Sequence, residues 1–551
     1  MRNRLIIWVL PALLMAYWGR TAAQEPSGLQ MVDLPGGKLR MAATEVTNRQ
    51  YEAFDPTHRR SFSTGDDDAV TMVSWDDARR FCLWLSQHTG RHFRLPSEEE
   101  WEWACRAGTA TPYNTGLTYP YPKAQANNRI KDTVSLQVAM SPPNAWGLYD
   151  MHGNVEEWCI DPWDAAGTMR VTRGGSHNME LRYLRSDARA AALADDRSVL
   201  RGFRVVEEIV NSSLADKPFF AEPMPYIVPP ADTQTPFFSH NHQPAVVAVG
   251  NDLLAIWFST DAEAGREMVV LQSRWHDGVW QPAALFFKVP ERNMTGSALM
   301  SLADGTLLHM GGVGDAGEWR DLALCVRRSV DGGRSWSPPV LAQPEHTVRH
   351  QVIAGPIATR SGRLLLCCDA GPGGDDGTAL HASDDGGLSW RDLGGTIRGI
   401  HAGIVELADG SLMALGRGQS LEGHMPCSRS YDSGVTWHYS PSPFPPIGSG
   451  QRLVLRRLQE GPLMLCSFGQ GGLYVALSYD EGTTWPVCRL LTDGHTRTLD
   501  GGAWTGTFTL DATHAEPAGY LACTQTPDGV IHLLSSRVHY RFNLKWIERD
   551  L

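Results

Sequence analysis

Ionisable side chains recur in the C-terminal half of the chain, directly before short apolar runs that are typical of buried strands. Three of these strand starts carry a histidine, at His242, His350 and His401. An imidazole changes its charge near neutral pH, so it can serve as a general acid or base. The strand starts and the segments beside them also hold carboxylates and guanidinium groups, namely Glu263, Arg266, Glu267, Arg292, Arg349, Arg452 and Glu516.

These side chains have two interpretations. A single histidine or arginine at a strand start is usually solvated or hydrogen-bonded to the backbone. Repetition at one position of successive strands instead indicates a shared rim, where functional side chains gather. If the strands share one axis, the three histidines converge on one pocket.

A repeated octet predicts how those strands are positioned. The pattern Ser-x-Asp-x-Gly-x-x-Trp begins at Ser329, Ser383, Ser430 and Ser478, and its closing tryptophans lie 54, 47 and 48 residues apart. The Asp can accept backbone N–H groups in a tight turn, the Gly allows a positive φ, and the Trp fills the gap between neighbouring units. Even spacing of this kind predicts a stack of small sheets and favours a β-propeller.

The octets resemble the Asp boxes of the sialidase superfamily. That resemblance implies an all-β six-bladed propeller over residues 237–551, in which residues 273–280 form a degenerate fifth copy. Asp boxes are structural, so they indicate the scaffold and leave the reaction open.

Sialidases hold the substrate carboxylate with three arginines and use a Tyr nucleophile, an activating Glu and an Asp acid. The segment GYLA (519–522) resembles the strand of the nucleophile, which gives that role to Tyr520. The segment HAGIVELADGSLMALGR (401–417) resembles the strand pair of the activating Glu and the second arginine. His401 then stands in the place of the Glu, and Arg417 matches the arginine. A neutral imidazole can take a phenolic proton, so we predict Tyr520 and His401 to be a catalytic pair.

Other positions depart from the sialidase pattern. His242 replaces the first arginine, and the segment GGLYVALS (471–478), where the third is expected, contains none. Glu263 or Glu267 is the candidate for the acid. The candidates for substrate binding beside Arg417 are His242, Arg266, Arg292, Arg349, His350, Arg452 and Glu516. The propeller is expected to need no cofactor.

Residues 24–206 have a different character. Helices are predicted after Ser74 and Ser97, each with acidic residues in its first turn. The segments EVTN (45–48), RLPSEEEWEWACRAG (94–108), NAWGLYDMHGNVEEWC (144–159), RVTRGGS (170–176) and GFRVV (202–206) resemble the sulfatase-modifying-factor family. The resemblance implies the α+β fold of formylglycine-generating enzymes, which is related to C-type lectins.

The copper site of that family is altered in this sequence. Met179 and Leu184 stand where active members have two copper-binding cysteines. A thioether is a poor substitute for a thiolate, and Leu cannot bind metal. We therefore expect neither copper nor formylglycine generation.

The family's calcium site has counterparts in this sequence. Asp150 and Glu157 could supply carboxylates, and Gly153 and Val155 could supply carbonyls, which are oxygen ligands of the kind calcium prefers. The alternative is that the two carboxylates only bond loop amides.

The start of the chain resembles an export signal. Arg2 and Arg4 precede an apolar run at residues 5–18, and residues 21–23 form a small-residue cleavage site. A transmembrane helix is the alternative, but the run is short and contains Pro11. We expect a secreted or periplasmic protein with no stable membrane span after signal cleavage. The net charge of −12 argues against a nucleic-acid partner, and residues 207–236, with six prolines, are predicted to be a linker.

The sequence thus predicts a multidomain exported protein that acts on a carbohydrate or glycoconjugate. The leading hypothesis is an exo-acting glycoside hydrolase of the sialidase superfamily with a non-standard active site. A Tyr/His pair can also support β-elimination from a uronic acid. The alternatives are a non-catalytic glycan-binding protein with two degenerate enzyme-like domains, and a scaffold that grips another secreted protein.

Overall fold

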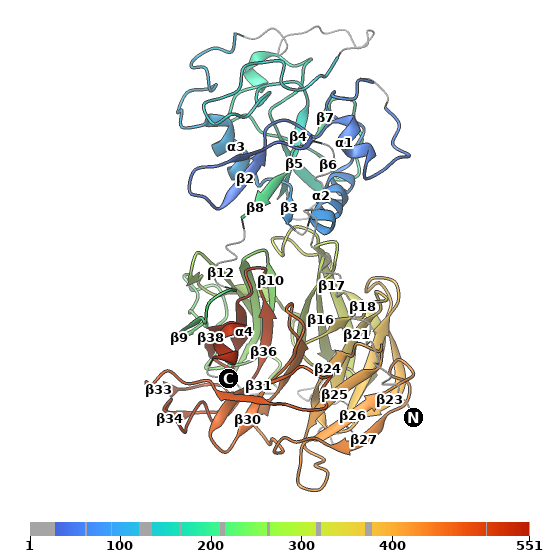
Figure 1. The fold of residues 1–551 in the computed structure, drawn as a ribbon, viewed down its shortest axis with the longest axis vertical. Helices are drawn as coiled ribbons and strands as arrows, with labels where there is room; N and C mark the ends of the chain where they lie inside the picture. The colour runs from blue at the N-terminus through green and yellow to red at the C-terminus, as the bar shows by residue number, and fades with distance from the viewer. Residues whose placement is uncertain are drawn as a thin grey trace, which may run out of the picture.

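The computed structural model describes residues 28–60, 63–89, 91–120, 135–164, 168–209, 215–261, 265–315, 321–369, 377–502 and 504–549. The chain forms an N-terminal domain of helices and sheets and a large all-β region (Figure 1). The predicted export signal at residues 1–23 lies outside the described residues, and so does Glu263. Among the described helices, none combines the length and the apolar character needed to cross a membrane.

The described part of the N-terminal domain packs short helices against two small sheets. The helices are α1 (Asn48–Glu52), α2 (Trp75–Thr89) and α3 (Glu98–Arg106), and a 3-10 turn spans Leu181–Tyr183. One sheet has the order β1 (Met31–Asp33), β2 (Leu39–Ala42), β8 (Val206–Glu208) and β3 (His92–Arg94). The other has the order β6 (Ala190–Leu193), β5 (Met169–Arg173), β4 (Glu156–Pro162) and β7 (Arg201–Gly202).

Both helices that were predicted after a serine are present, and each serine exchanges hydrogen bonds with the acidic residue three positions on. Ser97 Oγ accepts from the backbone N–H of Glu100 at 3.2 Å, and Glu100 Oε2 accepts from the N–H of Ser97 at 2.7 Å. Ser74 and Asp77 make the same exchange at 3.1 and 3.0 Å. These side chains satisfy N–H groups that a helix start leaves without partners, which is why both helices begin there.

The all-β region begins with four antiparallel sheets. The first contains β10 (His240–Val249), β11 (Asp252–Thr260), β12 (Val269–His276), β13 (Val279–Trp280) and β14 (Ala284–Phe287). The second contains β15 (Ser297–Ser301), β16 (Leu307–Gly314), β17 (Leu322–Ser329) and β18 (Val340–Thr347). The third contains β19 (Gln351–Val352), β20 (Ile357–Ala358), β21 (Leu364–Asp369), β22 (Thr378–Ser383) and β23 (Arg391–Ile397). The fourth contains β24 (Ile400–Glu406), β25 (Leu412–Arg417), β26 (Pro426–Ser430) and β27 (His438–Pro441).

The region continues with further sheets of the same kind. One contains β29 (Val454–Arg457), β30 (Leu463–Gly469), β31 (Gly472–Ser478) and β32 (Val487–Leu490). The last contains β36 (Ala522–Gln525), β37 (Ile531–Leu534), β38 (Val538–Phe542) and β9 (Phe220–Pro225). Two short pairs accompany them, β28 (Gln451–Arg452) with β35 (Gly519–Tyr520) and β33 (Thr496–Leu499) with β34 (Gly506–Thr509). Helix α4 (Leu544–Glu548) follows β38.

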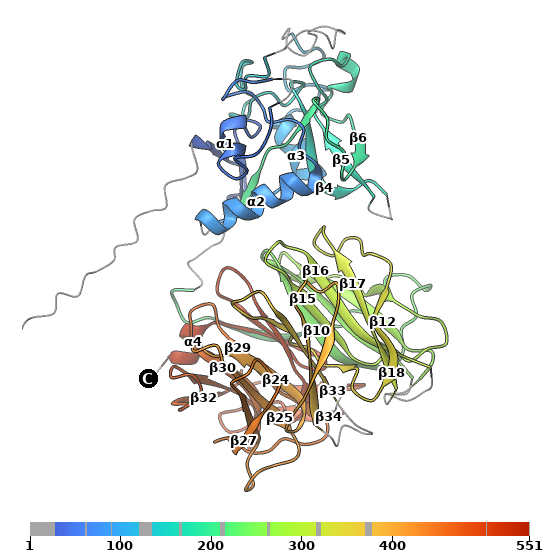
Figure 2. The same cartoon turned by 90° about the vertical axis from the view of Figure 1, so that its right-hand side faces the viewer.

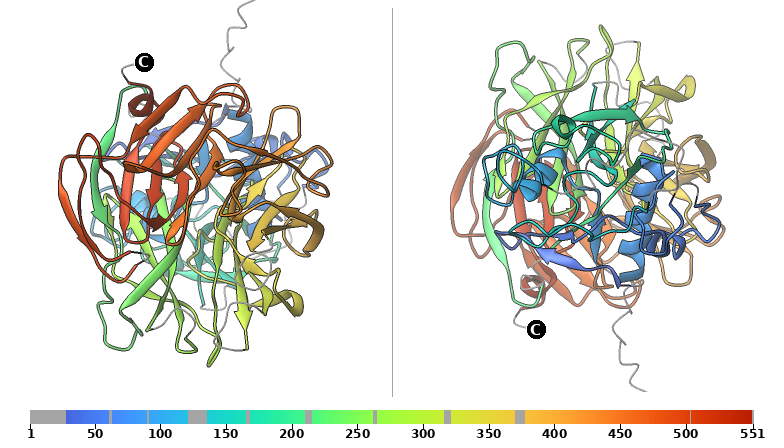
Figure 3. Two further views of the ribbon diagram at one scale, coloured as in Figure 1. Left: turned by 90° about the horizontal axis from the view of Figure 1, so that it is seen from below. Right: turned by 90° about the horizontal axis from the view of Figure 1, so that it is seen from above.

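The sheets follow one another in chain order, and the last returns to the first. Strand β10 lies beside β15 on one side and β36 on the other, while β21 lies beside β24 and β24 beside β29. Between β29 and β36, Arg456 Nη1 donates to the carbonyl of Cys523 at 2.8 Å. Seen from below and from above, the colours accordingly run around the region in sequence (Figure 3).

The segment predicted to be a linker contributes a strand instead. Residues 220–225 form β9, which pairs antiparallel with β38 in the last sheet. Pro223 and Pro225 lack a backbone N–H, but β9 lies at the edge of its sheet, where one side needs no partner. The prediction of a structureless linker over residues 207–236 was therefore wrong for this strand.

The repeated octets form the turns that the sequence predicts. In the first, the Asp331 carboxylate accepts from the backbone N–H of Ser335 at 2.9 Å, and Trp336 Nε1 donates to the carbonyl of Gly333 at 3.2 Å. The octet glycine has a positive φ in all four copies, and a Cβ placed on it would lie 2.5–2.8 Å from an apolar side chain of the preceding sheet. The pairs are Gly333 with Leu254, Gly387 with Leu308, Gly434 with Leu380 and Gly482 with Met413. The glycine thus permits the turn and also seats one sheet against the next.

Substitution of Gly434 by Ala tests this packing. We expect Gly434→Ala to cost more stability than Gly410→Ala in the same sheet. Both positions have a positive φ, which costs an alanine roughly 1–2 kcal/mol, but a Cβ at Gly434 would also meet Leu380 at 2.5 Å, whereas Gly410 has open space. Urea unfolding should give an additional loss of about 1–3 kcal/mol for Gly434→Ala. Equal losses would contradict the packing role.

The N-terminal domain contacts the second sheet through α2 and β5, and Figure 2 shows α2 on the side that faces the all-β region. Arg79 donates to the carbonyls of Val330 and Asp304, both at 2.9 Å. Arg170 Nη1 lies 3.3 Å from the buried carboxylate of Asp331, the aspartate of the first octet. One octet turn therefore also serves as a contact between domains.

A chain of buried neutral side chains joins the first sheet to the last. Trp280 Nε1 donates to His539 Nδ1 at 3.1 Å, and His539 Nε2 lies 2.9 Å from His532 Nδ1. His532 Nε2 in turn lies 3.1 Å from Thr526 Oγ1. Since Trp280 can only donate, each imidazole must carry one proton, on Nε2. Protonation of either ring would break one of these hydrogen bonds.

The buried, neutral histidines of this hydrogen-bonded series, together with the separately buried His309, predict that acid destabilises the protein. Burial lowers the pKa of His309 and His532 to about 3, and that of His539 well below the ordinary 6.5. Between 6.5 and the lowered pKa the unfolded chain binds more protons, so stability is complete above pH 6.5 and falls as the pH decreases. Each unit by which folding lowers a histidine pKa contributes about 1.4 kcal/mol to the free energy of unfolding at neutral pH. Burial raises the pKa of Glu516 to about 7, which offsets part of the loss.

The measurement is the free energy of unfolding in urea at pH 7.5 and at pH 5.5. We expect a lower value at pH 5.5, and a smaller difference between the two in His309→Phe, since that ring packs among aromatic side chains. His438→Phe, at an exposed site, is the matched control and should leave the difference unchanged. Stability that is constant or higher at pH 5.5 would contradict the assignment.

Candidate functional site

A pocket of about 330 Å³ opens where the inner strands of the all-β region begin. Its described lining is His240, His242, Gln243, Thr295, Gln351, Asp369, Ile400, His401, Arg417, Ser449, Gly450, Gly502 and Tyr520. The other end of β10, including Val249, faces a cavity of about 1720 Å³ that is also lined by α2 of the N-terminal domain. The candidate site therefore lies at the end of the inner strands that faces away from the N-terminal domain.

A buried carboxylate, imidazole and phenol form a line at the pocket floor. His401 Nε2 lies 3.0 Å from Tyr520 Oη, and His401 Nδ1 lies 2.5 Å from Asp369 Oδ2. The three side chains are 4, 7 and 2 % exposed, in the order His401, Tyr520, Asp369. The carboxylate fixes the imidazole proton on Nδ1, so the lone pair of Nε2 faces the phenolic hydroxyl. This is the arrangement in which an imidazole can accept the proton of Tyr520.

Irregular backbone aims the imidazole at the phenol. The pairing of β24 with β25 shifts register between Ile400 and Gly403, and His401 has a φ of 53°. The backbone N–H of His401 donates to Asp369 Oδ1 at 2.6 Å, which holds this conformation in place. Strand β10 has a similar shift after His242, where Gln243 has a φ of 53°. Bulges and positive φ values of this kind often mark functional sites, because they turn side chains out of the sheet.

Two guanidinium groups lie beside the phenol. Arg417 Nη1 donates to Tyr520 Oη at 3.1 Å and to the carbonyl of Gln451 at 3.1 Å. Arg452 lies beneath the ring, 5.2 Å from its centre, and is held by the carbonyls of Leu521 and Pro244. Burial lowers the pKa of Arg452 to about 10, so it remains charged at neutral pH. Both guanidinium groups therefore place positive charge beside the phenol ring.

Two imidazoles of the site, those of His242 and His401, are kept neutral at pH 7. The ring of His242 lies 4.2 Å from that of Tyr520, and burial lowers its pKa well below 6.5, with further lowering from His240 and Arg452. Burial also lowers the pKa of His401, although the Asp369 carboxylate raises it in part. A neutral His401 can act as a base, whereas a neutral His242 cannot supply a proton as an imidazolium would.

The structure brings together four of the candidate residues from the sequence, Tyr520, His401, Arg417 and His242. Sequence reasoning missed Asp369, which ends the buried strand β21. The sequence did contain a signal for this residue, because Asp369 directly follows five apolar residues. A carboxylate at the end of a buried strand needs a hydrogen-bond or charge partner.

The other described candidates do not line the pocket, and most of them are engaged elsewhere. Glu267 accepts from Thr260 Oγ1 and the N–H of Asp261 at the end of β11. Arg349 pairs with Asp392, Arg292 pairs with Asp315, and the ring of His350 bonds the carbonyl of Leu322. Arg266 is exposed, Arg452 supports Tyr520 from below, and Glu516 accepts from the buried hydroxyl of Tyr540 at 2.7 Å.

In the N-terminal domain, the positions of the family's copper cysteines are apolar. Met179 and Leu184 pack with Tyr113 and Tyr119 in one cluster. A Cβ on Gly175 would lie 2.5 Å from Leu184 and 3.4 Å from the Met179 sulfur. Neither side chain offers the thiolate that copper requires there, so these residues do not fit the metal.

The predicted calcium ligands lie in a buried acidic cluster. Glu157 accepts from Arg204 through both oxygens at 2.6 Å, and Asp150 Oδ2 accepts from the N–H of Ala139 at 2.6 Å. Glu45, also buried, has one carboxylate oxygen with no hydrogen-bond partner among the described residues. Burial and the charge of Asp150 raise the pKa of Glu45. The carboxyl oxygens of these three residues are hard donors, which fits calcium in donor type.

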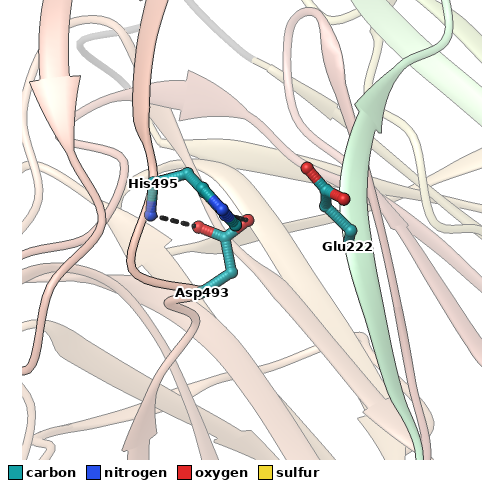
Figure 4. A group of neighbouring side chains, drawn as sticks. All are labelled: Glu222, Asp493 and His495. Atoms are coloured by element: carbon teal, nitrogen blue, oxygen red, sulfur yellow. Dashed lines mark hydrogen bonds and ion pairs between the residues drawn. The ribbon is translucent and has the colours of Figure 1, made fainter.

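A second group of potential metal ligands lies on the surface. Figure 4 shows Asp493 and His495 bonded to each other, with Glu222 of β9 across from them. Arg497 Nη2 donates to Asp493 at 2.7 Å and lies 3.9 Å from Glu222. A guanidinium therefore already compensates these carboxylates, and the group carries no metal assignment.

Comparison with known proteins identifies both parts of the chain. Residues 251–533, just over half of the chain, match the family model described as "BNR repeat-like domain". Residues 19–209 match the "Sulfatase-modifying factor enzyme 1-like domain".

Curated relatives and solved structures each match part of the chain. The inactive C-alpha-formylglycine-generating enzyme 2 of Bos taurus is 40% identical over 119 residues, covering 19% of this chain and 38% of that protein. The formylglycine-generating enzyme of Thermomonospora curvata is 32% identical over 170 residues, covering 24% of this chain and 54% of that protein. This chain therefore spans about half or less of the length of these relatives. The NanB sialidase structure from Streptococcus pneumoniae is 13% identical with a TM-score of 0.46, covering 69% of this chain and 78% of that chain.

The electrostatics of the site can be tested by titration. Because the Asp369 carboxylate raises the pKa of His401 while burial lowers it, Asp369→Asn should lower that pKa further. In spectra of histidine-labelled protein, the signals of His401 should then remain those of a neutral ring to a lower pH than in the wild type. Asp384→Asn, on an exposed turn, should leave the titration unchanged. An unchanged or raised pKa in Asp369→Asn would refute the coupling.

Proposed function

Because the chain belongs to the BNR repeat-like domain family and carries a sulfatase-modifying factor enzyme 1-like domain before it, we propose that it is a glycan-active enzyme that cleaves a glycosidic bond. The observation that carries the proposal is the phenol of Tyr520, held between the base His401 and the cation Arg417 in a pocket. A tyrosine that only packs in a core does not need both partners.

In the proposed mechanism, Tyr520 is the reactive group and His401 Nε2 receives its proton. Asp369 keeps the imidazole in the required tautomer and stabilises the imidazolium that forms. Arg417 and Arg452 stabilise the phenolate, and neither needs to move to do so. The burial of Tyr520, His401, Asp369 and Arg452 strengthens their interactions, because little water screens them.

The pocket supports a small, terminal sugar as the substrate. Its volume of about 330 Å³ is at the lower end of the range for ligand sites, roughly 300–1,000 Å³. We therefore propose exo-action on one sugar residue at a time. The N–H groups of Arg417 and the polar groups of Thr295, Gln351 and Ser449 would hold its hydroxyl or acidic groups.

The architecture supports a ring of blades as the frame for this site. We propose that the successive sheets are the blades of a six-bladed propeller, with β9 and β38 together closing the last blade. The return of β36 to β10 supports closure, and the lining of the pocket by strands from several sheets supports a shared axis.

For the N-terminal domain we propose a non-catalytic role. Met179 and Leu184 support the absence of copper chemistry, and Asp150, Gly153, Val155 and Glu157 would hold a structural calcium ion, with a carboxyl oxygen of Glu45 beside them. The basic and apolar residues of the first 23 positions support export to the periplasm or the medium.

The enzymatic proposal is tested by release of sugar from a panel of sialosides and uronosides. Tyr520→Phe should lose at least about 10³-fold in kcat/KM, and Asp369→Asn about 10²-fold or more, since proton transfer contributes 10²–10⁴-fold. Tyr439→Phe, whose exposed hydroxyl bonds Thr396, is the matched control and should keep full activity.

Full activity of folded Tyr520→Phe would remove Tyr520 from the mechanism. No turnover of any glycan by the wild-type protein, together with binding to a glycan array, would replace the enzyme by a glycan-binding protein.

A further inference from the structure

Building on the proposed function, we infer that Gln243, Thr295 and Gln351 form a neutral subsite that selects the terminal sugar by its hydroxyl groups. All three side chains line the described pocket together with Tyr520 and His401. Gln243 comes from β10, Thr295 from the segment just before β15, and Gln351 from β19, so three successive sheets contribute. An amide and a hydroxyl can each be donor and acceptor, as a sugar hydroxyl can, and neither carries a charge.

Gly296 brings these three residues together. Its backbone N–H donates to Gln243 Oε1 at 3.1 Å. Its φ is +80°, and a Cβ placed on it would lie 2.5 Å from the carbonyl oxygen of Val352, the neighbour of Gln351. A glycine at this position therefore lets the segment that carries Thr295 lie against both β10 and β19.

The contact with Gly296 also orients the amide of Gln243. An N–H group needs an acceptor, so the oxygen of the amide faces Gly296 and the NH2 group is left for another partner. That NH2 group makes no hydrogen bond within the described chain, although the residue is only 7 % exposed. The backbone of Gln243 has a φ of 53° and lies in a bulge of β10. Backbone strain of this kind, at a residue whose donor is left unused beside a pocket, is typical of a binding residue.

Thr295 is also held in place by its backbone and has an unused side chain. Asn293 Oδ1 accepts from the N–H of Thr295 at 2.8 Å, which fixes the segment. Thr295 Oγ1 has no hydrogen-bond partner among the described residues, and the residue is 1 % exposed. Leaving a buried hydroxyl unpaired costs stability, and a hydroxyl of the substrate would remove that cost.

Gln351 places the subsite beside the pair of Asp369 and His401. It is the cross-strand partner of Asp369, so the two side chains point to the same face of their sheet. Asp369 contacts His401 from that face, and His401 contacts Tyr520. A sugar that is held by the subsite would therefore lie next to the imidazole and the phenol.

The first test uses 4-nitrophenyl glycosides of neutral, sialic and uronic sugars and, for the one that is cleaved fastest, its monodeoxy counterparts. We expect the wild-type protein to lose about 10-fold or more in kcat/KM when one particular hydroxyl is absent, because polar groups of the subsite are then left unpaired. Thr295→Val and Gln351→Leu should each lose about 10-fold on the parent glycoside. Each variant should no longer distinguish the parent from one of the deoxy glycosides, since the two missing groups were partners.

The second test is the midpoint of urea unfolding, which separates a binding hydroxyl from a structural one. Thr295→Val removes an unpaired hydroxyl, so its midpoint should equal or exceed that of the wild type. Thr526→Val is the matched control, because the hydroxyl of Thr526 is also buried but bonds Asp528 at 2.6 Å and His532 at 3.1 Å. This control should lose stability and keep kcat/KM.

Three outcomes would contradict the inference. A midpoint of Thr295→Val that falls as far as that of Thr526→Val would assign the hydroxyl to the fold and overturn it. Wild-type kcat/KM in both Thr295→Val and Gln351→Leu on every glycoside would overturn it and leave the proposed function standing. No cleavage of any glycoside by the wild-type protein would refute the proposed function and the inference together.

Discussion

The structure depends on how closely each small sheet packs against the next. A sheet of four short strands cannot bury its own faces, so its stability comes from its neighbours. The octet glycines mediate this contact, since each leaves room for an apolar side chain of the preceding sheet where a Cβ would collide. Because the contact repeats from sheet to sheet, it fixes where each inner strand begins. The residues that begin those strands become neighbours as a consequence.

The close packing of the sheets holds the buried charged groups of the site in fixed positions. In a flexible chain, burying these groups would cost free energy. Asp369, His401, Tyr520 and Arg452 are nearly or fully buried, and each polar contact compensates another. The carboxylate of Asp369 lies against the imidazole of His401, and the guanidinium groups of Arg417 and Arg452 lie against the phenol of Tyr520. Such a buried network is stable only when every member is paired, which makes it sensitive to any single substitution.

The two domains have different relations to this site. The N-terminal domain contacts the opposite end of the inner strands, through Arg79 and through the buried pair of Arg170 and Asp331. It therefore does not contribute to the pocket at the other end. Its own altered positions, Met179 and Leu184, pack as apolar side chains. The pocket that contains Tyr520 and His401 is lined by residues of the all-β region.

The sequence by itself determined the parts that depend on local patterns. The octets predicted the turns because Asp, Gly and Trp act within eight residues, and Ser97 with Glu100 predicted a helix start for the same reason. It also selected Tyr520, His401 and Arg417, although only through a resemblance. The tertiary structure decided what depends on residues far apart in the chain. Asp369 is 32 positions from its partner His401, and His401 is 119 positions from Tyr520. Arg452 was predicted to bind substrate but lies under the phenol, and β9 emerged from a presumed linker because it pairs with β38. No local pattern encodes such contacts, since they arise only when the sheets pack against one another.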